Sequence, residues 1–237
     1  MSEKYLNNRF FTLYFLPLII GSLTVFSFQP FNLTIINFFI LPIFFYLIIY
    51  INKKSKSTYR KKPFRKNLFI FGTSFGFGYF FSGLHWITNS LTFDQSFQVF
   101  IPITIVLMPL FLSLFFSLVT LLIGPFLSLN FQSILLLSGA LSFSDYIRSK
   151  ILSGFPWNLW TYSFSWATEL LQILNIIGLF ALNLVYLTIF ILPAILFFNI
   201  SFNKKFIGIS IIPIIIFVSY IYGDHSINQN KKSLNLV

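Results

Sequence analysis

The 237-residue sequence contains no cysteine and few acidic residues, and both scarcities narrow what it can do. Without cysteine, these residues cannot form a disulfide, a thiolate metal site or a thiol nucleophile. Only five residues are Asp or Glu and only 9% of the chain is charged, so polar side chains are too few to cover a water-facing surface. The composition is typical of a protein that lies largely within a lipid bilayer.

What the chain has instead is a series of long apolar runs. Hydrophobic residues make up 57% of the sequence, and the mean hydropathy is +0.84. Several runs approach or exceed the ~20 residues that a helix needs to cross a bilayer. We predict an all-α polytopic membrane protein with seven transmembrane helices, over residues 10–28, 33–51, 67–91, 97–127, 131–147, 167–199 and 206–222. Residues 1–222 would form this transmembrane domain, and residues 223–237 a tail.

The 16 cations lie mainly in the connections between these helices. The densest cluster fills one short connection: Lys53, Lys54, Lys56, Arg60, Lys61, Lys62, Arg65 and Lys66. Because Lys and Arg are enriched in cytoplasmic loops, this cluster predicts a cytoplasmic N-terminus, and seven crossings then predict a periplasmic C-terminus. The cations are not spread over a soluble face, so we expect no nucleic-acid partner.

The stretch 145–166, DYIRSKILSGFPWNLWTYSFSW, lies between two apolar runs and differs from both. It holds three of the four tryptophans, Trp157, Trp160 and Trp166, together with cations and a carboxylate. Aromatic rings and long cations are typical of the headgroup level of a membrane. Asp145 and Arg148 are three residues apart, so on a helix they share one face and can pair.

Under the predicted topology, residues near the end of the third helix face the same outer surface. We predict a lipid-binding rim there, formed by His85, Trp86, Asp145, Arg148, Phe155, Pro156, Trp157, Trp160, Tyr162 and Glu169. Two simpler interpretations stand beside this one: His85 is also typical of an ordinary headgroup-level residue, and Asp145 with Arg148 of a structural ion pair. We find no Ser, His and Asp at a spacing typical of a catalytic triad, no metal-ligand cluster and no glycine-rich phosphate loop. We therefore assign no catalytic residue, metal or cofactor.

Small and polar residues inside two predicted helices indicate how these helices pack. In the third helix, glycines at close spacing favour close approach of neighbouring backbones: Gly72, Gly76, Gly78 and Gly83. The sixth helix carries polar residues that we expect on one face, directed into the bundle: Glu169, Gln172, Asn175 and Asn183.

Several segments resemble the bacterial apolipoprotein N-acyltransferase family. Asp145-x-x-Arg148, Ser153-Gly154-Phe155-Pro156-Trp157 and Tyr162-Ser163 resemble its acidic-x-x-Arg, Thr-Gly-Phe-Pro-Trp and Gly-Tyr-Ser signature. Residues 26–31 are similar to the turn after its first helix, residues 76–87 to its third helix, and residues 174–184 to its sixth. The chain departs from the family at Asp145, where Glu is common, at Ser153, which replaces Thr, and at His85, which precedes Trp86 in place of a small or polar residue.

This resemblance implies a transferase of the bacterial inner membrane. In the family, a cysteine thiolate takes an acyl chain from a phospholipid and passes it to the N-terminal amine of a diacylglyceryl-cysteine on a lipoprotein. Family members continue into a nitrilase-like domain with a Glu-Lys-Cys triad, and the end of this sequence resembles the start of that domain. We therefore expect a membrane part that is inactive alone, with three partners: a phospholipid acyl donor, a diacylglyceryl lipoprotein and, if the gene is split, a separate nitrilase-like catalytic chain.

The resemblance also implies roles for individual residues. Trp157, Trp160 and Tyr162 would line the headgroup or acyl channel, and Arg148 would hold a phosphate or brace the Gly-Phe-Pro-Trp loop through Asp145. Two other classes of function stay open: a catalytically inactive scaffold or lipid-binding protein of the same fold, and a transporter. The transporter is disfavoured because the halves of the chain show no inverted repeat and few charges lie near the bilayer midplane.

Overall fold

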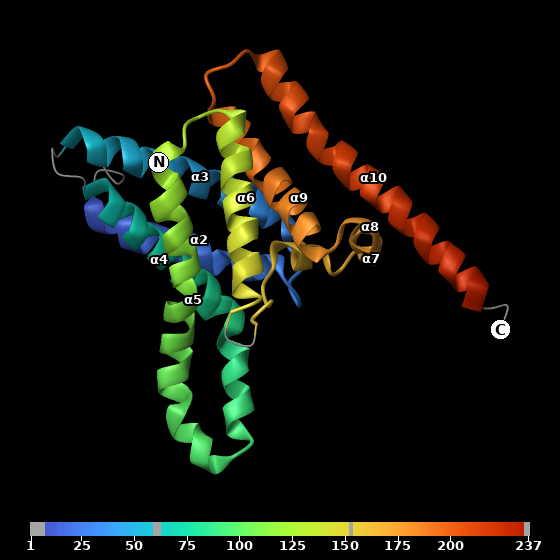
Figure 1. Ribbon diagram of the computed structural model, residues 1–237, viewed down its shortest axis with the longest axis horizontal. Coiled ribbons are helices and arrows are strands. Elements are labelled where there is room, and N and C mark those ends of the chain that lie inside the picture. Colours follow the sequence, from blue (N-terminus) through green and yellow to red (C-terminus); the bar gives the residue numbers. More distant parts are fainter. Residues whose placement is uncertain (1–7, 59–62, 152–153, 235–237) are drawn as a thin grey trace. The chain divides into compact units, whose positions relative to one another are not determined.

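A computed structural model describes residues 8–58, 63–151 and 154–234 (Figure 1). All regular elements in these ranges are helical, as predicted, and no strand occurs among them. The chain divides into two compact units: residues 1–25 with 43–128 form unit 1, and residues 26–42 with 129–237 form unit 2. Several predicted features lie outside the described ranges, namely Lys4, Ser153, the centre of the basic connection at 59–62 and the last residues of the tail, 235–237.

Unit 1 is built around four helical segments. They are α2 (Leu16–Leu23), the part of α3 (Asn37–Thr58) from Ile43 onward, α4 (Pro63–Leu84) and α5 (Ile101–Ile123). α4 packs against both α2 and α5. A Cβ on Gly72 would lie 2.8 Å from the Phe116 carbonyl oxygen of α5, and one on Gly78 would lie 2.2 Å from that of Leu18 in α2. The predicted close approach of helices at these glycines is therefore confirmed.

Aromatic rings fill the centre of unit 1. Phe44 of α3 lies 5.4 Å from Phe71 and 4.2 Å from Phe75, both on α4, measured between ring centroids, and all three side chains are fully buried. Hydrogen bonds add to this packing: Asn52 Nδ2 donates to the carbonyl oxygens of Gly124 and Pro125, at 3.2 Å each. These two bonds join α3 to the short helix η6 (Gly124–Phe126), which follows α5.

The predicted third transmembrane helix, 67–91, is too long at its far end. The α-helix stops at Leu84, and two short 3-10 helices follow, η4 (His85–Thr92) and η5 (Gln95–Phe100). The segment after Leu84 carries Thr88, Asn89 and Ser90, whose side chains favour local turns over a regular helix. Thr88 and Ser90 do bond locally, each donating from its hydroxyl to the carbonyl oxygen three residues before it.

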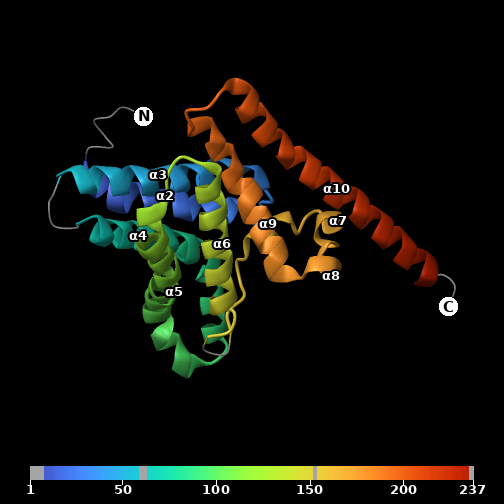
Figure 2. The same ribbon diagram turned by 45° about the horizontal axis from the view of Figure 1, so that its top comes forward.

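Unit 2 is organised around two adjacent helices, α6 (Phe131–Arg148) and α9 (Leu179–Ile191), which lie side by side in both views (Figures 1 and 2). Ser142 Oγ donates to the Phe180 carbonyl oxygen across this contact, at 3.0 Å. Residues 26–42 also belong to unit 2, and the ring of Phe38 meets that of Phe190 on α9 at 4.9 Å. α10 (Phe202–Leu234) contacts the rest of unit 2 through η8 (Leu192–Phe197) and α7 (Thr168–Leu171).

The prediction of one continuous sixth helix over 167–199 is wrong. The segment is divided into α7, α8 (Leu174–Ile177), α9 and η8. The break before α9 is at Gly178, whose φ of +78° is outside the helical region and is readily adopted only by glycine. The polar residues consequently do not share one face: Asn183 is fully buried, whereas Asn175 is exposed.

Four helical segments in the described ranges are long and apolar enough to cross a membrane: Thr34–Ser55, Gln95–Phe126, Leu179–Phe197 and Phe202–Lys231. The described part of the chain is thus all-helical, and these segments indicate a membrane protein. Helices also occupy the predicted first, third and fifth spans, but they are not among these four; Phe11–Ser27 is shorter, and α6 carries several serines besides Asp145 and Arg148. The seven crossings and the sides of the two termini stay predictions. α10 extends through the predicted domain boundary at 222 as far as Leu234.

Candidate functional site

The centre of the predicted site is a buried ion pair on the last turn of α6. Arg148 Nη2 lies 3.0 Å from Asp145 Oδ1. Arg148 is only 2% exposed, and Asp145 is 7% exposed. The expected pairing of these two side chains is therefore confirmed. Because both are removed from solvent, the loss of either partner would leave a buried unpaired charge, which costs more stability than breaking a surface ion pair.

The same arginine holds the loop that follows α6. Its Nη1 donates to the carbonyl oxygens of Phe155 and Trp157, at 2.8 Å each, and its own carbonyl oxygen accepts from the Phe155 backbone N–H at 3.1 Å. Gly154 makes the turn with φ +85°, and a Cβ there would lie 2.5 Å from the Ser149 carbonyl oxygen. Of the two roles predicted for Arg148, these contacts favour bracing the loop.

Asn183 extends this network from α9. Its Nδ2 donates to Asp145 Oδ2 at 3.0 Å, and its Oδ1 accepts from the Thr161 backbone N–H at 3.2 Å. Both Asn183 and Thr161 are fully buried. An amide side chain within an apolar helix predicts that Asn183 points into the bundle, but it does not predict which group Asn183 bonds.

The aromatic side chains of the central stretch divide into two groups. Trp157 and Trp166 are 50% and 54% exposed, whereas Trp160 is 1% exposed and belongs to the core of unit 2. Tyr162, Phe155 and Pro156 are half-buried. Burial raises the pKa of the Tyr162 phenol, and the positive charge of Arg148 opposes this only in part. Trp157, rather than Trp160, is thus the ring that the loop presents on the surface.

Thr34 ties the segment after the first helix to this region. Its hydroxyl donates to the Ser163 carbonyl oxygen and accepts from the indole Nε1 of Trp166, the latter at 2.8 Å. Thr34 itself is 5% exposed. The exposed Trp166 ring is therefore held in one orientation by a buried partner 132 residues away in the chain.

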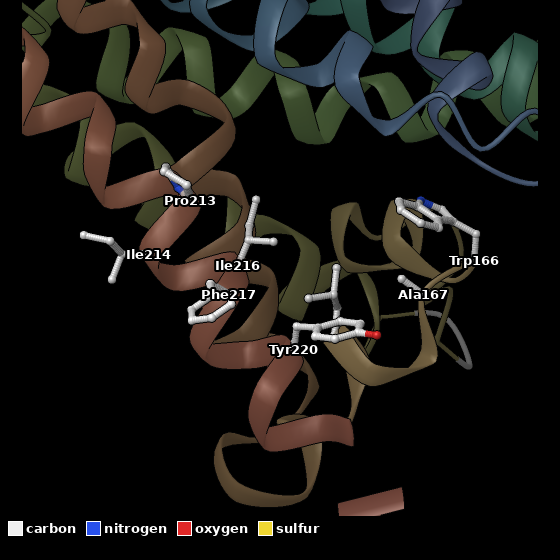
Figure 3. A pocket seen from close by; sticks show the side chains of 8 residues that line it. Trp166, Ala167, Pro213, Ile214, Ile216, Phe217 and Tyr220 are labelled. Carbon is white, nitrogen blue, oxygen red and sulfur yellow. The ribbon is translucent and has the colours of Figure 1, made fainter. Parts of the chain in front are cut away.

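Beside Trp166 an open apolar groove of about 640 Å³ runs between the start of α7 and α10 (Figure 3). Trp166 and Leu170 line one side, and Ile216, Phe217 and Tyr220 of α10 line the other. Figure 3 shows the Tyr220 ring reaching from α10 toward the segment that carries Trp166. This groove could not be predicted from the sequence, because it exists only where two segments about 50 residues apart come together.

The remaining predicted site residues are not joined to this network by the contacts described. Glu169 is half-buried, and its backbone carbonyl faces Gly223 of α10, where a Cβ would lie 1.8 Å from the oxygen. His85 and Trp86 are exposed and belong to unit 1, with His85 Nδ1 2.9 Å from the Ser82 carbonyl oxygen. The other eight predicted residues belong to unit 2. That all ten form one rim stays a prediction.

Comparison with known proteins assigns the chain to a family. Residues 20–192 match the family described as apolipoprotein N-acyltransferase N-terminal domain. The chain belongs to this family. The match includes the Asp145–Arg148 pair, the loop to Trp157 and Asn183, whereas α10 lies beyond its end.

Individual relatives agree with this assignment. The chain is 33% identical to the apolipoprotein N-acyltransferase of Rhodopseudomonas palustris over 182 residues, and this alignment covers 76% of the chain. It is 28% identical over 179 residues to that of Brucella melitensis (74% of this chain) and 28% identical over 184 residues to that of Sinorhizobium medicae (77%). The matched parts are 33%, 33% and 34% of these relatives, so the chain corresponds to about a third of their length. The resemblance predicted from the motifs is confirmed.

Proposed function

We propose that this chain is the membrane-embedded part of an apolipoprotein N-acyltransferase. In this role it crosses the bacterial inner membrane several times and supports transfer of an acyl chain from a phospholipid to the N-terminal diacylglyceryl-cysteine of a lipoprotein. The proposal is supported by the family membership, by the rigidly held loop that carries Trp157 and by the apolar groove beside Trp166.

The observation that carries the proposal is the support beneath Trp157. An exposed tryptophan on a mobile loop would lose conformational entropy on binding a lipid, and this loss weakens binding. Here the Trp157 carbonyl is fixed by a buried guanidinium, which is itself fixed by Asp145. The loop is therefore preorganised to place an amphipathic ring at headgroup level, where tryptophan is favoured.

The groove beside Trp166 would supply an apolar surface for a lipid chain. Its volume of about 640 Å³ lies within the ~300–1,000 Å³ typical of small-molecule sites. Its walls are the rings of Trp166, Phe217 and Tyr220 together with aliphatic side chains, which suits an acyl chain better than a polar group. In the proposal, the groove takes an acyl chain of a lipid-linked substrate.

The covalent step is not assigned to these residues. The mechanism implied by the family needs a thiolate to form the thioester, and none of the 237 residues is a cysteine. The thiol would come from protein outside this sequence. These residues would then contribute binding and orientation, which act by holding two reactants together and not by changing their chemistry.

A genetic experiment tests the proposed pathway. In the organism of origin, the gene that encodes this chain is deleted, and the N-termini of lipoproteins are analysed by mass spectrometry. We expect loss of the amide-linked acyl chain, and its return when the intact gene is restored. Unchanged N-acylation in the deletion strain would refute the proposal and favour the alternative, an inactive scaffold or lipid-binding protein of the same fold.

A binding experiment tests the groove itself. The chain is reconstituted in nanodiscs, and a fluorescent synthetic diacylglyceryl-cysteinyl peptide is titrated into it. Phe217 is 64% exposed in the open groove. Phe217→Ala should weaken binding by about tenfold, since covering part of this ring with a bound acyl chain is worth roughly 1–2 kcal/mol. Phe202→Ala is the matched control, because Phe202 is on the same helix, is 78% exposed and does not line the groove. Equal affinities of the two variants would remove the groove from the proposal.

A further inference from the structure

A second apolar groove, of about 280 Å³, opens at the end of unit 2 where α10 begins. Ile195 of η8 and Phe198, just after the end of η8, line it together with Ile207 and Ile211 of α10. Figures 1 and 2 show that the start of α6 and the start of α10 lie at this same end. The groove shares no lining residue with the one beside Trp166.

One polar side chain lines this groove, the ammonium-bearing Lys204. Lys204 is exposed, and no hydrogen bond or ion pair engages its ammonium group within the described part of the chain. The adjacent Lys205 differs, because its Nζ donates to the Leu196 carbonyl oxygen at 3.0 Å and it does not line the groove. Of two neighbouring cations, one is used by the fold and the other is left at the mouth of an apolar groove.

The acidic side chains described in unit 2 lie far from Lys204. Asp224 is 20 residues further along α10, which corresponds to about 30 Å of helix. Asp145 is 14 residues from the start of α6, or about 21 Å along it. Glu169 lies beside Gly223, which is 19 residues from Lys204 along α10, or about 28 Å of helix. The groove therefore has a positive mouth, and none of the carboxylates described in unit 2 is close enough to neutralise it.

We propose that this groove is a binding site for an anionic phospholipid. Part of one acyl chain lies against Ile195, Ile207 and Ile211, and the phosphate of the headgroup meets Lys204. The apolar segment of α10 that can cross a membrane begins at Phe202, so Lys204 is at the level where phosphates lie. A basic side chain at the mouth of an apolar pocket between membrane helices is suited to such headgroups.

The lack of a nearby carboxylate among the described residues of unit 2 selects among phospholipids. A zwitterionic headgroup carries an ammonium as well as a phosphate, and in this groove the ammonium would meet Lys204 and none of those carboxylates. An anionic headgroup such as phosphatidylglycerol carries only the phosphate charge, so its attraction to Lys204 is not offset. This site is separate from the substrate groove, and the inference does not depend on the proposed acyltransferase role.

The test uses the full 237-residue chain in mild detergent. Long-chain phosphatidylglycerol or phosphatidylcholine is titrated in mixed micelles, and bound lipid is counted by native mass spectrometry. We expect phosphatidylglycerol to bind about fivefold tighter, which corresponds to the ~1 kcal/mol typical of one lysine near an anionic lipid surface. The preference should fall as ionic strength rises, because the contact is partly exposed to solvent. Equal binding of the two lipids would overturn the proposal.

Three variants with the same change in net charge locate the site. Lys204→Gln should abolish the preference, whereas Lys205→Gln and Lys231→Gln, which remove cations outside the groove, should retain it. An equal loss in all three variants would mean a general charge effect and would refute the site. Competition with inorganic phosphate and with dihexanoyl phosphatidylglycerol tests whether the long acyl chain contributes to binding. Displacement of the long-chain lipid by millimolar phosphate would also refute the site, whereas failure of both competitors to displace it would support the site.

Discussion

Asn183 Nδ2 donates a hydrogen bond to Asp145 Oδ2 at 3.0 Å, and this contact joins α9 to the last turn of α6. Through it, a carboxylate that already balances Arg148 also accepts from a second helix. The loop that carries Trp157 is consequently held by residues from two helices.

The first prediction concerns Asn183. Asn183→Leu leaves Asp145 Oδ2 and the Thr161 backbone N–H without this buried partner, and an unsatisfied buried group costs about 1–3 kcal/mol. We expect a lower midpoint of thermal unfolding in detergent. Asn175→Leu, an identical change at an exposed position, should alter stability by no more than about 0.5 kcal/mol. Equal midpoints for the two variants would contradict the network.

The second prediction concerns the ion pair. Asp145→Asn leaves the buried Arg148 guanidinium without its counter-charge, which should destabilise the chain by about 3–5 kcal/mol. The double variant Asp145→Asn with Arg148→Met removes the stranded charge and should recover part of that loss. In the double variant the loop carbonyls lose their donor, so the anisotropy of Trp157 fluorescence should fall. A double variant less stable than Asp145→Asn alone would argue against this account.

The third prediction separates two tryptophans of the same loop region. Trp160→Ala creates a cavity in the core of unit 2 and should cost about 3–5 kcal/mol. Trp157→Ala removes a half-exposed ring and should leave the unfolding midpoint within about 1 kcal/mol of the parent. Acrylamide quenching checks the assignment independently, since the loss of Trp157 should remove more of the quenchable emission than the loss of Trp160. The reverse order of stabilities would show that the burial is assigned wrongly.

The fourth prediction concerns the close approach of α10 to α7 at Gly223, near the groove beside Trp166. Gly223→Ala places a Cβ 1.8 Å from the Glu169 carbonyl oxygen, so α10 must move away from α7. Stability and binding of the diacylglyceryl-cysteinyl peptide should both fall. Gly139→Ala, on α6 with nothing within 4 Å of the new Cβ, should instead stabilise the chain by about 0.5–1 kcal/mol, as is usual inside a helix. A Gly223→Ala chain as stable as Gly139→Ala would show that α10 does not pack there.

Local spacing allowed some features to be predicted without a structure. The pairing of Asp145 with Arg148 follows from three-residue spacing on a helix, and the close approach at Gly72 and Gly78 follows from the absence of side chains. The prediction of one continuous sixth helix was wrong for a reason that is also local. Hydropathy is insensitive to backbone dihedrals, so an apolar run gives no sign that Gly178 adopts a positive φ and ends the helix.

The sequence by itself determined the class of protein, the helical content and the family, because these depend on composition, on apolar run length and on motifs read along the chain. Only the tertiary structure decided that Trp157 is exposed while Trp160 is buried, that Asn183 meets Asp145, and that Lys204 rather than Lys205 lines an apolar groove. The physical reason is that burial and hydrogen-bond partners depend on segments distant in the chain. Neighbouring residues of the same type can therefore have opposite surroundings.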